Sequence, residues 1–173
     1  MCFGDRKIII SICIALILIF IISVVIIIIN NNNITKPNIL VSIARPGDNT
    51  ALGTTSIKFS ENSIIEGSAL SHVDGSDKIN INENGIYQIS YQLYGVQEVT
   101  GTFNFNAVLL VNDVALNDTF NESPVIRNST SNRMTLTSTV ILSLDAGDVL
   151  KLQGVSIEDI RYDNARIDIE KIV

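Results

Sequence analysis

Three pairs of carboxylates are the residues whose types and spacing are best suited to chemistry. They are Asp74 with Asp77, Asp145 with Asp148, and Glu158 with Asp159. Paired carboxylates can hydrolyse glycosides or bind calcium. The first two pairs also occupy turn-forming sequence, where aspartate side chains cap backbone N–H groups. Because no complete calcium-loop pattern surrounds any pair, we predict neither a catalytic residue nor a metal site.

Other groups that catalysis needs are scarce. His72 is the single histidine, and the two cysteines, Cys2 and Cys13, lie close to the N-terminus. Zinc sites and Cys-His or Ser-His-Asp catalysis therefore lack their parts in the rest of the chain. A Ser-Lys dyad stays open, although no motif indicates one. We predict a protein that is not an enzyme and binds no cofactor, with His72 in a loop or at a strand edge.

Charge and composition narrow the partners. The chain of 173 residues has a net charge of −6, and it has neither a Gly-rich phosphate loop nor a basic patch with interleaved aromatics. An acidic surface disfavours nucleic acid and anionic lipid as partners. We therefore expect no nucleic-acid partner.

Residues 8–29 form an apolar run without a charged side chain. About 20 such residues cross roughly 30 Å of hydrocarbon as a helix. A cleaved signal peptide would have a shorter apolar region and small residues before its cut site, which IIIINNNNITKP does not offer. We predict a cytosolic tail at 1–7, a single transmembrane anchor at 8–29, a polar spacer at 30–38 and an extracytoplasmic domain at 39–173. The short tail favours a cytosolic N-terminus.

From Ile39 onward, short alternating segments are broken by Gly, Asn and Asp. About nine runs rich in β-branched residues favour an all-β fold, an antiparallel sandwich or barrel. No segment has the helical period that a crossover between parallel strands would need. Turns are predicted at Asn84-Gly85, at Asn112-Asp113 and over Asp145–Asp148.

Residues 117–132 have dense polar side chains and little alternation. They predict a long surface loop with at most one short strand, at Val125 and Ile126. We expect this loop to face a ligand. Its candidate contact residues are Asn117, Asn121, Arg127 and Asn128.

The stretch ENGIYQISYQLYG, residues 83–95, predicts a strand with two different faces. One face, with Tyr87, Ile89, Tyr91 and Leu93, is suited to a core. The other carries Gln88, Ser90, Gln92 and Tyr94, and similar uncharged faces occur at Thr135, Thr137 and Thr139 and at Asn104, Asn106 and Val108. Uncharged faces that carry tyrosine are typical of protein interfaces. The alternative is that they simply face solvent.

Several motifs resemble one superfamily. ENGIYQISYQL resembles the Gly-x-Tyr strand of tumour necrosis factor ligands and of complement globular heads, and LSLDAGDVLKLQG resembles their turn with Gly147 and Asp148. FNAVLLVNDVAL is similar to the strand and hairpin between these elements. NARIDIEKIV is similar to the last strand of bacterial members, such as the head of collagen-like exosporium glycoproteins. The chain lacks a collagen-like stalk and the vertebrate-type Phe-Gly ending, so the resemblance implies the fold rather than a complement or receptor role.

The resemblance implies a jelly roll that assembles as a homotrimer around a three-fold axis. The interface would then include Gln88, Ser90, Gln92, Tyr94, Thr135, Thr137 and Thr139. We expect a membrane-anchored trimeric surface protein that acts in adhesion or recognition of a protein or glycan. One alternative is a structural coat or envelope-spacing protein with no specific ligand. Another is a carbohydrate-binding or hydrolytic jelly roll, which the absence of Trp disfavours.

Overall fold

The structure is a computed structural model that describes residues 16–25, 37–49, 53–97, 101–119, 121–122, 126–129, 132–156 and 160–173. The chain divides into two compact units, residues 1–36 and residues 37–173. In the first unit, residues 16–25 form an α-helix. Among the described residues, no helix has the length and apolar character needed to cross a membrane. The remainder of the predicted anchor lies outside the described residues, as do the tail 1–7 and residues 30–36, so the anchor stays a prediction.

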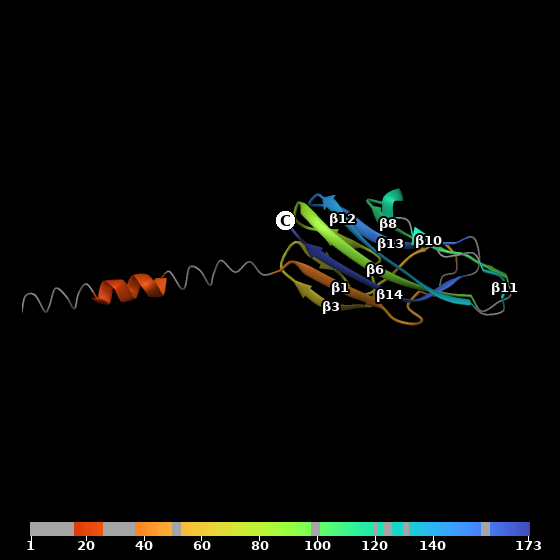
Figure 1. The fold of residues 1–173 in the computed structure, drawn as a ribbon, viewed down its shortest axis with the longest axis horizontal. Coiled ribbons are helices and arrows are strands. Elements are labelled where there is room, and N and C mark those ends of the chain that lie inside the picture. The colour runs from red at the N-terminus through yellow and green to blue at the C-terminus, as the bar shows by residue number, and fades with distance from the viewer. Residues whose placement is uncertain are drawn as a thin grey trace, which may run out of the picture. The chain divides into compact units, whose positions relative to one another are not determined.

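The second unit, which we call the head, is an antiparallel sandwich of two sheets (Figure 1). The five-stranded sheet has the order β12-β6-β14-β1-β3, with bounds Asn132–Leu144, Gly85–Gln97, Arg161–Lys171, Ile39–Ala44 and Glu61–Glu66. The seven-stranded sheet has the order β10-β8-β13-β5-β4, with bounds Asn121–Glu122, Asn106–Val111, Val149–Val155, Ile79–Ile81 and Leu70–His72. The smaller elements are β2 (Thr55–Ser56) on β13, β9 (Val114–Ala115) on β8, the separate pair β7 (Gly101–Phe103) and β11 (Ile126–Ser129), and the 3₁₀ turn η1 (Asn117–Thr119).

Alternate side chains of both sheets fill the space between them. The predicted core face of β6 is confirmed, because Tyr87, Ile89 and Leu93 are fully buried and Tyr91 nearly so. Leu109, Leu150 and Leu152 face them from the seven-stranded sheet and belong to the same core. Burying one such aliphatic side chain contributes about 1.5–3 kcal/mol. The head thus has a core of its own, and we treat it as an independent folding unit.

Two of the three predicted turns are confirmed, at Asn112-Asp113 and over Asp145–Asp148, and Asp148 joins them. At Asn84-Gly85 the predicted turn with positive φ is not found, because Gly85 is already the first residue of β6. Asn112 and Asp113 have φ of 53° and 65°, as a tight hairpin between β8 and β9 requires. Gly147 has a φ of 99°, which glycine adopts without strain. The Asp148 carboxylate accepts from Asn112 Nδ2 at 2.8 Å and from the Asp145 backbone N–H at 2.8 Å.

The Gly-x-Tyr motif has a physical basis at the start of β6. A Cβ on Gly85 would come within 2.4 Å of the Val173 carbonyl oxygen, so only glycine lets the C-terminus lie beside this strand. The Tyr87 hydroxyl donates to the Glu83 carbonyl at 2.6 Å. Lys171 and Glu83 form an ion pair at 2.8 Å, which lowers the pKa of the Glu83 carboxyl. The motif therefore joins the last strand to the segment before β6.

Two sequence predictions are wrong in detail. Asn104 and Asn106 do not share one strand, because β7 ends at Phe103 and β8 begins at Asn106. Moreover, β8 lies in the seven-stranded sheet, so Asn104, Asn106 and Val108 do not extend the polar face of β6. The segment 117–132 is not one irregular loop, since it contains η1, β10 and β11. Its strands pair with β8 and β7, which are distant in sequence, and single-segment alternation does not reveal such pairing.

Two buried tyrosines give a test of the core. The Tyr91 hydroxyl donates to the Thr119 carbonyl at 2.9 Å, whereas the Tyr162 hydroxyl has no hydrogen-bond partner within the described part of the head. Burial raises the pKa of the Tyr162 hydroxyl far above its usual value. We predict that Tyr91→Phe lowers the free energy of unfolding by about 1–2 kcal/mol, while Tyr162→Phe leaves it unchanged or raises it. Urea unfolding of the head at one protein concentration measures both, and equal losses would contradict the assignment.

Asp148→Ala tests the link between the two turns. We expect it to lower the free energy of unfolding by about 1–3 kcal/mol, because hydrogen bonds to a charged acceptor are lost from two backbone turns. Asp148→Asn keeps one acceptor oxygen and should cost less. The thermal unfolding midpoints of the three proteins give the order, and an Asp148→Ala head as stable as the parent would exclude this role.

Candidate interface on the five-stranded sheet

The carboxylate pairs singled out by the sequence take part in local structure. Asp74 accepts from the Asn62 side chain at 2.6 Å, and Asp77 lies 3.5 Å from Lys151 Nζ. Glu158 and Asp159 lie outside the described residues. Within the ranges that the structure describes, no three His, Cys, Asp or Glu side chains are grouped as metal ligands would be.

The predicted interface residues lie together on one surface. We call it the outer face: the side of the five-stranded sheet that points away from the core. Neighbouring strands align Tyr94 with Thr135, Gln92 with Thr137 and Ser90 with Thr139. The Ser90 and Thr139 hydroxyls are 2.8 Å apart and share a hydrogen bond. Tyr94 is half-buried, and the threonines are exposed.

The sequence analysis missed that β14 and β1 complete this face. Asn164 aligns with Tyr94, Arg166 with Gln92 and Asp168 with Ser90. On the next strand, Ile43 aligns with Arg166. The alternation in NARIDIEKIV already separates Arg166 and Asp168 from the buried Ile167 and Ile169. The pairing of β14 with β6 joins segments about 70 residues apart, so no local signal could place these charges beside Gln92.

The outer face therefore carries charge, contrary to the uncharged surface that the sequence suggested. Arg166 Nε donates to Asp168 Oδ1 at 3.0 Å and Oδ2 at 2.8 Å, and Arg166 Nη2 donates to Oδ1 at 2.8 Å. These hydrogen bonds raise the pKa of the Arg166 guanidinium. Because the two charges neutralise each other within one chain, the middle of the face presents polar groups with little net charge.

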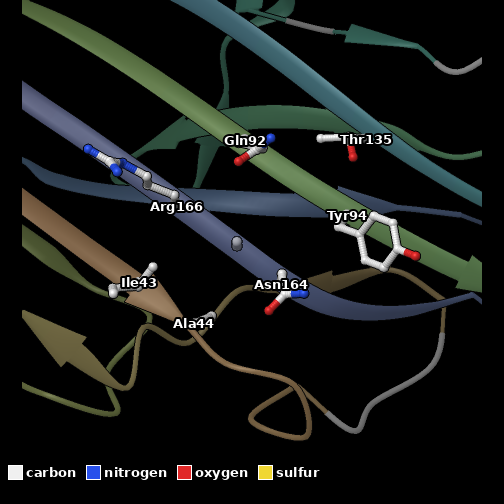
Figure 2. Close-up of a pocket in the computed structure, with 8 residues that line it drawn as sticks. Ile43, Ala44, Gln92, Tyr94, Thr135, Asn164 and Arg166 are labelled. Atoms are coloured by element: carbon white, nitrogen blue, oxygen red, sulfur yellow. The ribbon is translucent and has the colours of Figure 1, made fainter.

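The outer face is hollowed in two adjoining places. One hollow, of about 430 Å³, lies between β12, β6, β14 and β1, and Figure 2 shows Tyr94 beside Asn164 at one side of it and Arg166 toward the other. The second hollow, of about 570 Å³, shares Gln92 and Arg166 with the first. The two hollows are open and shallow, as suits a protruding protein surface better than an enclosed small molecule.

Toward the chain ends of the head, the outer face carries three exposed isoleucines, together with the exposed Glu170, which aligns with Gln88. Ile141 is 63% exposed, Ile86 41% and Ile172 49%. The Ile172 backbone N–H donates to the Ile86 carbonyl at 2.7 Å, so these two residues lie on neighbouring strands. Ile141 aligns with Gln88 one strand away. Apolar exposure gathered on one face, next to a polar area with tyrosine, is typical of a protein-binding surface.

The predicted ligand residues fall into separate elements. Asn117 begins η1, Asn121 lies in β10, and Arg127 and Asn128 lie in β11. Thr119 of η1 is buried: its hydroxyl accepts from the Leu109 N–H at 2.9 Å and donates to the Leu116 carbonyl. Asn121 Nδ2 donates to the Thr137 carbonyl at 2.7 Å and so caps the edge of β12. The first half of the predicted loop is therefore fixed to the sandwich, while β11 lies at the end of the head opposite the chain ends (Figure 1).

Known structures share this fold at low sequence identity. A crystal structure of murine APRIL at pH 8.0 matches with a TM-score of 0.57 and 14% identity, covering 80% of this chain and 100% of that one. The globular domain of zebrafish complement 1qA protein matches with a TM-score of 0.56 and 14% identity, covering 80% of this chain and 98% of that one. No curated protein matches this chain by sequence. These likenesses confirm the jelly-roll fold that the motifs predicted.

A family model gives the assignment at the level of sequence. The model described as the BclA C-terminal domain matches residues 47–173, which include β2 to β14 and nearly all of the head. Both resemblances stated from the motifs are thereby confirmed, the wider superfamily and the nearer bacterial members. The chain belongs to the BclA C-terminal domain family.

Proposed function

We propose that the head assembles as a homotrimer through its outer face and acts at a surface in adhesion or recognition, without catalysis. The observation that carries this proposal is the outer face itself. It combines a half-buried tyrosine, an ion pair within one chain and exposed isoleucines on the side of the sandwich that points away from the core. Homotrimers are what the superfamily resemblance implies, and copies of the chain are the partners that this face fits.

The two ends of the head differ in which elements they carry. The Lys171 N–H donates to the Asn38 carbonyl at 2.9 Å, so the first and last residues of the head lie at the same end. The β7–β11 pair lies at the other end (Figure 1). We therefore propose β11, with Arg127 and Asn128, as the part of the head that meets a protein or glycan ligand, because it lies at the end opposite the first and last residues of the head.

A structural coat without a ligand is the second candidate function. The observation that favours it is the fixed state of η1 and β10, which leaves fewer free groups for binding than a long loop would. A carbohydrate-binding or hydrolytic jelly roll is the third candidate function. It would need sugar-binding or catalytic side chains other than the carboxylate pairs and ion pairs described above.

Assembly is tested by one substitution at the centre of the outer face. We expect the head, residues 37–173, to sediment as a trimer at micromolar concentration, and Tyr94→Asp to weaken the trimer at least about 100-fold. The reason is that assembly would leave a carboxylate without a counter-charge in a desolvated contact, which typically costs about 3–5 kcal/mol. A parent head that is monomeric throughout would refute the trimer.

The matched control is Val114→Asp, which introduces the same charge at an exposed apolar residue of the β8–β9 hairpin, in the other sheet. It should leave the mass unchanged. If Val114→Asp dissociates the trimer and Tyr94→Asp does not, the interface lies on the seven-stranded sheet and our proposal is wrong. Circular dichroism confirms that each variant keeps its β-sheet signal.

Recognition is tested by screening the soluble head against glycans and surface proteins. We expect Arg127→Ala with Asn128→Ala to weaken a bound ligand at least about tenfold, the typical effect of losing one or two interface side chains. Asn117→Ala serves as the control at the side of the sandwich. Binding that survives the β11 substitutions removes β11 from the proposal, and a head that binds nothing favours the coat.

A further inference from the structure

His72 lies where the edge strands of the two sheets meet. It ends β4, the edge strand of the seven-stranded sheet, and is 7% exposed. Its side chain meets Asn62 of β3, the edge strand of the five-stranded sheet. The prediction of a strand-edge position is confirmed. His72 is therefore a buried ionisable side chain that connects the edges of the two sheets, and it takes no part in the proposed interface.

Both ring nitrogens of His72 face oxygen atoms. Nδ1 lies 2.7 Å from Asn62 Oδ1, and Nε2 lies 3.0 Å from the carbonyl oxygen of Ser76. The Ser76 oxygen belongs to the backbone and can only accept a hydrogen bond. It already accepts from the Phe59 N–H at 2.9 Å.

The orientation of the Asn62 carboxamide is fixed by its other contacts. Nδ2 donates to the His72 carbonyl at 3.1 Å and to Asp74 Oδ1 at 2.6 Å, and Oδ1 accepts from the Ser42 hydroxyl at 2.6 Å. Turning the amide over would place its oxygen against a carbonyl and a carboxylate, which are both acceptors. Asn62 therefore presents an acceptor to His72 Nδ1.

We propose that His72 is a proton-dependent clasp between the two sheets. A neutral imidazole has one N–H and can satisfy one of these two acceptors, whereas the imidazolium has two and satisfies both. In the neutral ring, a nitrogen lone pair must face an oxygen lone pair in a buried place, which is costly. The clasp is complete when the ring is protonated and loses one of its two hydrogen bonds when the proton leaves.

The charges around the ring are consistent with this assignment. The Asp74 carboxylate lies behind Asn62, so the amide links the imidazolium to a negative group. Asp77, next to Ser76, is paired with Lys151, and Glu61, next to Asn62, is paired with Arg45. Ser42 of β1 is neutral. The Phe59 and His72 rings pack edge to face, with their centroids 6.1 Å apart. Among these described contacts no cation opposes the second proton.

The sign of the pH effect follows. Imidazole in an unfolded chain changes charge near pH 6.5. A group that makes an additional hydrogen bond only in its protonated form adds stability at low pH, and that stability is lost as the pH rises. The carboxyls of Glu83 and Asp113, whose pKa values their lysine partners lower, act in the opposite direction and at lower pH. Opening should be local, at β3 and β4, because the core strands do not depend on this contact.

The single histidine makes the test direct. Nitrogen NMR of the ¹⁵N-histidine-labelled head, from pH 5 to pH 8.5, reports whether each ring nitrogen carries a proton. We expect both to be protonated at low pH in the folded head, and the loss of one to accompany a fall of roughly tenfold or more in the hydrogen-exchange protection of β3 and β4 amides. Protection in β6 and β14 should not change. A ring that stays neutral across this range overturns the proposal, and so does a ring that titrates without any effect on β3 and β4.

Two variants separate the clasp from simple packing. His72→Gln should remove the pH dependence of protection in β3 and β4, even if overall stability falls. Asn62→Ala removes the acceptor at Nδ1, so that the neutral and the protonated ring each keep one hydrogen bond, and the pH dependence of protection in β3 and β4 should disappear. A pH dependence that Asn62→Ala leaves unchanged would contradict the proposed contact. None of these outcomes depends on the oligomeric state or on a ligand.

Discussion

The pairing of β6 with two long neighbours is the constraint on which the head depends. β6 is aligned with β12 along all of Gly85–Gln97 and with β14 along most of its length. Side chains alternate between two faces, so this register fixes the core and the outer face together. A shift of one residue would expose Tyr87 and Tyr91 and bury Gln88 and Gln92. The Gly85 contact with Val173 and the Asp148 turns hold the strand ends in this register.

The alternation of apolar and polar residues predicted which side chains of a strand face the core, but not which strands are neighbours. The two faces of β6, its buried tyrosines and two of the turns follow from local chemistry: period-two patterning, Asn-Asp at positive φ, and Gly147 at positive φ. The place of β8 in the other sheet and of Arg166 beside Gln92 depends on pairing between distant segments. The motif resemblance supplied that topology in outline. It did not supply the ion pair, because a resemblance between motifs does not say which side chains of a strand bind each other.

The same limit explains the segment 117–132. Its polar composition correctly indicated the surface, yet Thr119 is buried and bonded to the backbone of Leu109 and to Leu116. Polar side chains that satisfy buried backbone groups look like loop residues in a sequence. The position of His72 at a strand edge was predicted, but its contacts were not. A lone histidine suggests little, and its significance comes from Asn62 and Ser76, which the fold brings to its two nitrogens.

The ion pair on the outer face has a consequence for how copies of the chain could meet there. An arginine and an aspartate that bind each other within one chain need no partner charge from a second copy, so burying them costs desolvation without a matching gain. Affinity must then come from the end with Ile86, Ile141 and Ile172 and from Tyr94, while the pair contributes selectivity. A partner surface that brought its own charge to the wrong position would set a like charge against Arg166 or Asp168. Such contacts are strongly disfavoured. A face with exposed isoleucines at one end and polar groups in the middle therefore suits association of identical chains in one register better than adhesion to varied surfaces.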